Sequence, residues 1–404
     1  MIQSSFVTMM TGKHPYHHGI VNMKPLKIPN KLIPLPLYLQ KTGYKTAAVD
    51  CNHRITGKYN PWFKRGYDTY LDPSEKKKTH LNLTAQEINQ CAIPWIRKHR
   101  NEKNTFLFLH YWDPHFPYIT EEEFTKWSEQ NALPTNNHEE DIPMKVVSRE
   151  PLYSFIKKYN GDKHSPQKIR QNYDGTVKQV DQAIGELVNT LKETNQYEDT
   201  LILLVSDHGE SLGEHKIYFD HHGLYDQTLH VPFILSCPAK LPKKKRITEI
   251  CQHEDIFPTI CQLANVKSIP QLGKIDGKSM MSIIEGKQKK FRSFAVSCEA
   301  NWQLKRSIRT KNWKLIQSLE QDVYGNPKWE LYNLQQDPKE TKNVVNNHPK
   351  IFASLKRTLL KWVQHNLSQY KLRDPLRIGI KVRLHRATVA EEEKVKKRLS
   401  ELGY

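Results

Sequence analysis

No apolar run in this chain of 404 residues approaches the ~20 residues that a membrane-spanning helix needs. The opening residues, MIQSSFVTMMTG, lack the charged start and the long apolar stretch of a signal peptide. The six cysteines are widely spaced and form no CxxC pair, which argues against a zinc ribbon or a disulfide scaffold and favours a reducing compartment. The sequence therefore predicts no membrane span and leaves the compartment open.

Acidic residues are scarce relative to basic ones: 43 Asp and Glu face 62 Lys and Arg, for a formal charge of +19. The excess lies in short runs, such as residues 76–78 and 243–246, which are typical of solvated loops. Alternatively, the positive charge attracts an anionic substrate such as a sulfated or phosphorylated polymer. Nucleic acid is not expected as a partner, because no basic motif with interleaved aromatic residues is present.

Short apolar runs alternate with segments of helical periodicity over residues 1–285. The run at residues 201–205 is rich in Leu, Ile and Val, which predicts a buried parallel strand. The alternation predicts a mostly parallel sheet with helices on both faces. The expected strands are residues 45–49, 105–111, 201–205 and 231–236, and the expected helices are residues 32–44, 83–99, 173–194 and 255–264.

The pattern changes after residue 285. Short alternating segments at residues 294–298, 306–309, 313–318 and 329–334 predict a small antiparallel sheet, followed by a helix at 351–366. The expected organisation is an α/β domain at 1–285, a smaller α+β subdomain at 286–372, and a basic tail with a terminal helix at 373–404.

The strand expected at residues 201–205 is followed by Asp207 and His208. Ligands of open α/β sheets bind just beyond the carboxyl ends of the strands. A carboxylate beside an imidazole at that point is placed to hold a metal ion. The alternative is that Asp207 only caps a following helix.

Eight segments, in order along nearly the whole chain, carry motifs of one enzyme family. Five are TGKHPYHHG at 11–19, GYKTAAVDCNH at 43–53, FLFLHYWDPHFPY at 106–118, TLILLVSDHGESLGEH at 200–215 and YDQTLHVPFIL at 225–235. The others are RSIRTKNWKLI at 306–316, ELYNLQQDPKETKN at 330–343 and LGY at 402–404. With these motifs the chain resembles the sulfatase family of the alkaline-phosphatase-like superfamily. The resemblance implies hydrolysis of a sulfate ester with a divalent cation, usually calcium, and a formylglycine made from Cys or Ser.

The resemblance also implies roles for individual residues. Asp207 and His208 match metal ligands, although many family members have Asn at the second position. Three histidines, His53, His115 and His221, match catalytic positions that contact the substrate, the last of them a position where many members have a sulfate-binding Lys. Other histidines, such as those in the segment at 11–19, are expected to be structural.

The expected nucleophile is missing. Counted back from the family's Thr-Gly pair, its position is occupied by Ile2, which has no nucleophilic atom, and Phe6 replaces a supporting Arg. A formylglycine is therefore not available in this chain. Three explanations are open. In the first, a strand with two Asp ligands precedes this chain in a longer protein. In the second, the fold binds an anion without turnover. In the third, Ser4, Ser5 or Thr8 supplies the hydroxyl.

The sequence thus predicts an alkaline-phosphatase-like α/β fold and a metal-dependent sulfuric ester hydrolase acting on an anionic small-molecule or polysaccharide sulfate ester. The alternatives are a phosphate or phosphonate ester hydrolase on the same fold and a non-catalytic anion-binding remnant. The substrate and the oligomeric state are left open.

Overall fold

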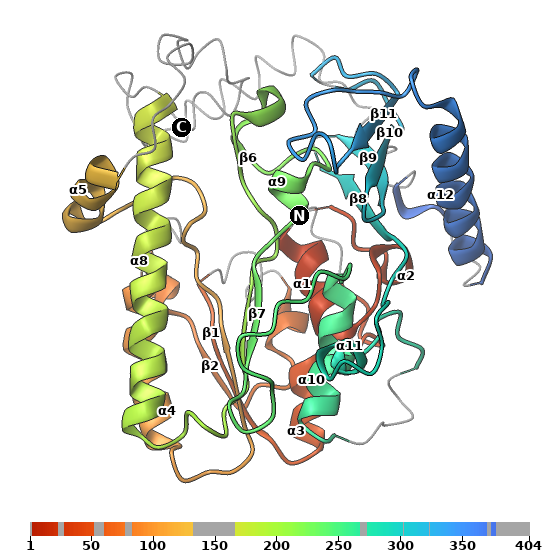
Figure 1. Cartoon of the computed structure of the whole chain (residues 1–404). Coiled ribbons are helices and arrows are strands. Elements are labelled where there is room, and N and C mark those ends of the chain that lie inside the picture. The colour runs from red at the N-terminus through yellow and green to blue at the C-terminus, as the bar shows by residue number, and fades with distance from the viewer. Residues whose placement is uncertain are drawn as a thin grey trace, which may run out of the picture.

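The computed structural model describes residues 2–22, 28–51, 60–76, 83–131, 166–266, 273–301, 303–322, 324–369 and 373–376. The strands of the first part lie between two groups of helices (Figure 1). One group is α4 (Ala85–Lys98) and α8 (Pro166–Glu193), and the other is α1 (Ile2–Thr11), α3 (Leu35–Lys41) and α10 (Ile256–Leu263). None of the helices in these ranges is long and apolar enough to cross a membrane.

Strand β1 (Lys45–Val49) is the centre of a parallel sheet with the order β2-β1-β3, in which β2 is Thr69–Leu71 and β3 is Thr105–Leu109. Ala47, Ala48 and Val49 are at most 1% exposed, as expected for a parallel strand covered on both faces. The predictions of a strand at 45–49 and of a helix near 83–99 are confirmed. The strand expected at 105–111 ends earlier than predicted, because β3 stops at Leu109.

The strand expected at 201–205 exists, but among the described residues its pairing is antiparallel instead of the expected parallel pairing. β4 (Ile202–Val205) pairs antiparallel with β7 (Phe233–Ser236), and it is half-buried rather than fully buried. An all-apolar run of four residues fits either direction, because direction is set by how the chain returns to the sheet. Within the described ranges, β3 pairs only with β1 and β4 only with β7, although both strands contribute to the same hydrophobic core.

The C-terminal part contains the predicted antiparallel sheet (Figure 1). Its order is β11-β10-β9-β8, and α12 (Pro349–Gln369) packs against it through Leu355, Leu359 and Val363. The strands are β8 (Ala295–Ala300), β9 (Leu304–Arg309), β10 (Trp313–Ser318) and β11 (Trp329–Asn333). The domain boundaries at 285 and 372 stay predictions, and residues 377–404 of the expected tail lie outside the described residues.

Shorter elements connect these parts. They are α2 (Pro15–His18), α5 (Glu122–Asn131), α9 (Asp226–Leu229), α11 (Met281–Ile284) and the hairpin of β5 (Ser211–Leu212) with β6 (Tyr218–Asp220). The hairpin and α9 lie between the strand β4 and the C-terminal sheet in the chain's path, and they carry the residues described next (Figure 1).

Candidate active site

Three histidines from separate loops meet beyond the ends of the strands. His115 follows β3, His208 follows β4, and His221 follows β6. One nitrogen of each lies within 4.8 Å of the other two. The rings of His208 and His221 are stacked with centroids 4.1 Å apart, and the ring of His115 lies 5.4 Å from His221 and 5.9 Å from His208. The structure thus brings together three of the residues that the sequence singled out.

Backbone carbonyl groups orient two of these rings. Nδ1 of His115 is 2.8 Å from the carbonyl oxygen of Phe116, and Nδ1 of His208 is 2.9 Å from that of Gly209. A carbonyl oxygen only accepts hydrogen bonds, so in the neutral rings each Nδ1 carries the proton and each Nε2 carries a lone pair. Nε2 of His208 is buried and has no hydrogen-bond partner among the described residues. Such an atom is suited to bind a cation.

Burial keeps two imidazoles of this cluster, those of His115 and His221, uncharged near neutral pH. Burial and the neighbouring His208 lower the pKa of His115 to about 4. Burial, together with His208 and His115, lowers the pKa of His221 well below its usual value. The neutral imidazoles of His115 and His221 carry no charge that would attract an anion, whereas their lone pairs can bind a metal ion.

Carboxyl groups surround the cluster. Asp207 lies beside His208, with Oδ2 3.6 Å from Nε2. Burial raises its pKa, but electrostatic attraction to His208 and other neighbouring groups outweighs burial and keeps the pKa below its usual value, so Asp207 is ionised. Burial and the carboxylates of Asp220 and Asp207 raise the pKa of Glu210 well above its usual value, which keeps that side chain protonated.

Three further residues, Asp220, His222 and Glu299, hold the loop that carries His221 in place. Nε2 of His222 lies 2.8 Å from Asp220, and its Nδ1 lies 3.4 Å from Glu299 on β8. Burial opposes the charge of His222, but hydrogen bonds to both carboxylates raise its pKa to about 9. Glu299 is fully buried and also accepts the backbone N–H of Gly223 at 2.9 Å. The C-terminal sheet therefore holds the loop that carries His221, a contact between distant segments that local sequence patterns do not reveal.

The other residues named from the sequence are His53, Ile2, Thr8, Ser4 and Ser5. His53 lies outside the described residues. Ile2 is 4% exposed in α1 and packs in the hydrophobic core. The Thr8 hydroxyl donates to the carbonyl oxygen of Ser4 at 2.9 Å and lies 3.0 Å from Nε2 of His18, so both of its contacts are internal. Ser4 and Ser5 are half-buried on the same helix.

Gly209 lets the loop that carries His208 approach α9 closely. A Cβ at this position would lie 2.0 Å from the carbonyl oxygen of Gln227. Gly209→Ala is therefore expected to lower the free energy of unfolding by about 1–3 kcal/mol, because backbone must move to admit the methyl group. Denaturant unfolding measures the loss. The matched control is Gly185→Ala in α8, where the new Cβ meets nothing within 4 Å. A loss no larger than that of the control would contradict the close approach.

Known proteins similar to this chain identify its family. The sulfatase family model matches residues 3–266, and the model of the C-terminal region of N-sulphoglucosamine sulphohydrolase matches residues 213–365. The chain is 28% identical over 218 residues to N-acetylglucosamine-6-O-sulfatase of Bacteroides thetaiotaomicron, covering 52% of this chain and 37% of the relative. It is 28% identical over 359 residues to arylsulfatase K of Gallus gallus, covering 80% and 65%. It therefore spans less than two thirds of the length of either relative.

Solved structures show the same fold. The structure of BT4656 in complex with its substrate D-glucosamine-2-N,6-O-disulfate matches with a TM-score of 0.70 at 21% identity, covering 92% of this chain and 89% of that one. The phosphonate monoester hydrolase of Agrobacterium radiobacter matches with a TM-score of 0.68 at 18% identity, covering 90% and 86%. The predicted alkaline-phosphatase-like fold is thereby confirmed. Because the family match at residues 3–266 covers more than half of the chain, the chain belongs to the sulfatase family.

Proposed function

We propose that the protein hydrolyses sulfate monoesters at the cluster of His115, His208 and His221 with a bound divalent cation. The observation that carries the proposal is the convergence of these three imidazoles beyond the ends of the strands. One of them has a buried nitrogen without a hydrogen-bond partner among the described residues. Family membership supports the reaction class. Relatives in the same fold bind sulfated sugars, such as D-glucosamine-2-N,6-O-disulfate and a neocarrahexaose, which supports a sulfated saccharide as the substrate class.

The donor atoms favour one kind of cation. Calcium takes six to eight oxygen ligands, whereas imidazole suits zinc and related metals. Within the described ranges, no group of three ligand atoms within 4.8 Å of one another contains two carboxylates. The described residues therefore fit calcium poorly, and we propose a zinc-like cation held by the three imidazoles near Asp207. Such a cation supplies Lewis-acid polarisation of an ester oxygen.

The residues of the chain bind and orient the ester. The ionised Asp207 beside His208 would balance part of the cation's charge. The ion pairs of His222 with Asp220 and Glu299 hold the loop that carries His221. Ile2, at the position expected for the nucleophile, has no oxygen atom that could attack the ester. That observation favours a second candidate function, an anion-binding protein without turnover. The intact mass of the protein from its native source, compared with 47.4 kDa for this chain, tests for further residues that would supply the nucleophile.

Turnover of an aryl sulfate, an aryl phosphate and an aryl phosphonate, each with zinc, with calcium and with a chelator, tests the proposal. We expect the sulfate ester to react fastest, with zinc. His115→Ala should lower kcat/KM at least about 100-fold, because the ester loses a positioned imidazole. His365→Ala, on the exposed side of α12, is the matched control. Preference for the phosphate or phosphonate would support the alternative hydrolase. Metal-dependent sulfate binding without turnover would support the anion-binding protein.

A further inference from the structure

The carboxyl ends of β1, β2 and β3 bring a second set of metal-binding side chains together. Val49 and Leu109 are partners in the parallel register, so Asp50 and His110 leave neighbouring strands side by side. The His110 N–H donates to the carbonyl oxygen of Val49 at 3.0 Å, and the Asp50 N–H donates to that of Leu71 at 2.9 Å. The backbone of all three strands thus fixes where these side chains begin.

Three ligand types converge at this point. One ligand atom from each of Asp50, Cys51 and His110 lies within 4.8 Å of the other two. Asp50 is 2% exposed and Cys51 is fully buried, whereas the His110 side chain is 12% exposed. Nδ1 of His110 lies 2.7 Å from Oδ1 of Asp50, and the Tyr70 hydroxyl donates to Oδ2. The carboxylate is therefore held in one orientation before any ligand binds.

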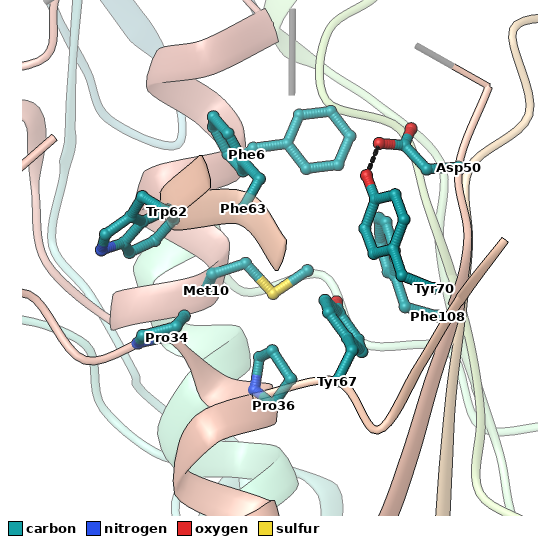
Figure 2. Close-up of a pocket in the computed structure, with 10 residues that line it drawn as sticks. All are labelled: Phe6, Met10, Pro34, Pro36, Asp50, Trp62, Phe63, Tyr67, Tyr70 and Phe108. Atoms are coloured by element: carbon teal, nitrogen blue, oxygen red, sulfur yellow. Dashed lines mark hydrogen bonds between the residues drawn. The ribbon is translucent and has the colours of Figure 1, made fainter. Parts of the chain in front are cut away.

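An aromatic pocket leads to the carboxylate. Figure 2 shows Phe6, Trp62 and Phe63 on one side of the pocket and Tyr67, Tyr70 and Phe108 on the other, with Asp50 at one end. The ring of Phe6 also packs against His110, with the centroids 4.8 Å apart. Apolar walls strengthen the attraction between the buried carboxylate and a cation.

The Cys51 thiol lies in a negatively charged environment. Burial, together with the carboxylates of Asp50, Asp72 and Asp113, raises the pKa of this thiol well above its usual value. Of these carboxylates, an oxygen of Asp50 lies within 4.8 Å of the Cys51 sulfur. A divalent cation would compensate these charges and stabilise the thiolate.

We propose that Asp50, Cys51 and His110 form a binding site for a zinc-like divalent cation. A thiolate, an imidazole and a carboxylate are together the ligands that zinc prefers, and sulfur excludes calcium and magnesium. On binding, the Sγ–H bond breaks, its proton goes to solvent and the Sγ–metal bond forms. The proton on Nδ1 of His110 moves to Nε2 as Nδ1 takes the metal. Three protein ligands leave a fourth position for water.

This site differs in residues and in chemistry from the cluster of His115, His208 and His221, and it does not depend on the proposed hydrolysis. The imidazole cluster contains no sulfur, so a thiolate ligand reports on the second site alone. Cobalt(II) replaces zinc in such sites, and a thiolate ligand to cobalt gives a charge-transfer absorption band in the near ultraviolet.

Titration of the full chain with cobalt(II), followed by absorption, tests the site. We expect the charge-transfer band in the wild type, in His208→Ala, and in the control Cys261→Ser, whose sulfur lies on α10. Cys51→Ser should abolish the band and remove one bound zinc per chain. Asp50→Asn, a variant of the same size, should raise the Kd for cobalt at least about tenfold. Circular dichroism confirms that each variant is folded.

The proposal is overturned if the wild type gives no thiolate band, or if the band keeps its intensity in Cys51→Ser. It is also overturned if the band is lost equally in Cys261→Ser. Loss of the band in His208→Ala would also overturn the proposal, because His208 is not one of the three ligands of this site.

Discussion

Lys314→Ala is expected to lower the free energy of unfolding by about 3–5 kcal/mol, because it leaves buried carboxylates without their cation. Lys314 lies on β10 and is fully buried. Its Nζ is 2.5 Å from Oδ1 of Asp226 and 2.6 Å from Oε1 of Glu340. Asp226 keeps Arg309 as a second partner at 3.2 Å, so the larger penalty falls on Glu340, which is also fully buried.

Two further variants test whether the buried carboxylate that is left without a cation causes this loss of stability. Lys311→Ala, on the exposed turn that precedes β10, is expected to change stability by no more than about 0.5 kcal/mol. Adding Glu340→Gln to Lys314→Ala should restore part of the loss, because the neutral amide is easier to bury. Equal effects of Lys314→Ala and Lys311→Ala in denaturant unfolding would contradict the ion pairs.

Acid is expected to destabilise the protein through His14. This side chain is 3% exposed, its Nε2 lies 3.0 Å from the carbonyl oxygen of Val296, and its Nδ1 accepts the N–H of Tyr16 at 3.2 Å. Burial lowers the pKa of His14 to about 4. Because this value is below that of the unfolded chain, about 6.5, the unfolded state takes up the proton first as the pH falls. The penalty is absent above pH 6.5 and grows to about 3 kcal/mol at pH 4.

Comparison with His14→Gln isolates this effect from other titrating groups. The wild type's stability relative to the variant should fall by about 3 kcal/mol between pH 7 and pH 4, as measured by urea unfolding at both values. His365→Gln, at an exposed position, should keep a constant difference from the wild type. If the His14→Gln difference is also independent of pH, the imidazole is not held neutral by burial.

Local sequence patterns predicted the helices and strands that are determined by the residues within them. The run at 45–49 is a strand because apolar residues bounded by Gly43 and Asp50 fit a buried sheet, and the structure has it at those residues. The helix expected at 32–44 is shorter, Leu35–Lys41, because it begins directly after Pro34. The antiparallel pairing of β4 with β7 was not predicted, because an apolar run carries no information about which strand pairs with it.

The candidate site was predicted in part. His115, His208 and His221 were singled out by their motifs, and the structure brings them together. His110 follows β3 directly, so the rule that drew attention to Asp207 at the end of β4 would have found it. Glu299 and Lys314 could not have been found in this way. Their partners are distant in the sequence, and Lys and Glu side chains are expected to be exposed rather than buried.

The strands β3 and β4 have a consequence for the behaviour of the protein in solution. Along each of them, within the described ranges, one row of backbone N–H and C=O groups has no neighbouring strand. Such a row is a template on which an extended segment of another molecule can form hydrogen bonds. Repulsion between chains that each carry a formal charge of +19 opposes that contact at low ionic strength. Salt screens the repulsion but leaves the strand edges unchanged, so the colloidal stability of the protein depends on its counterions as much as on its fold.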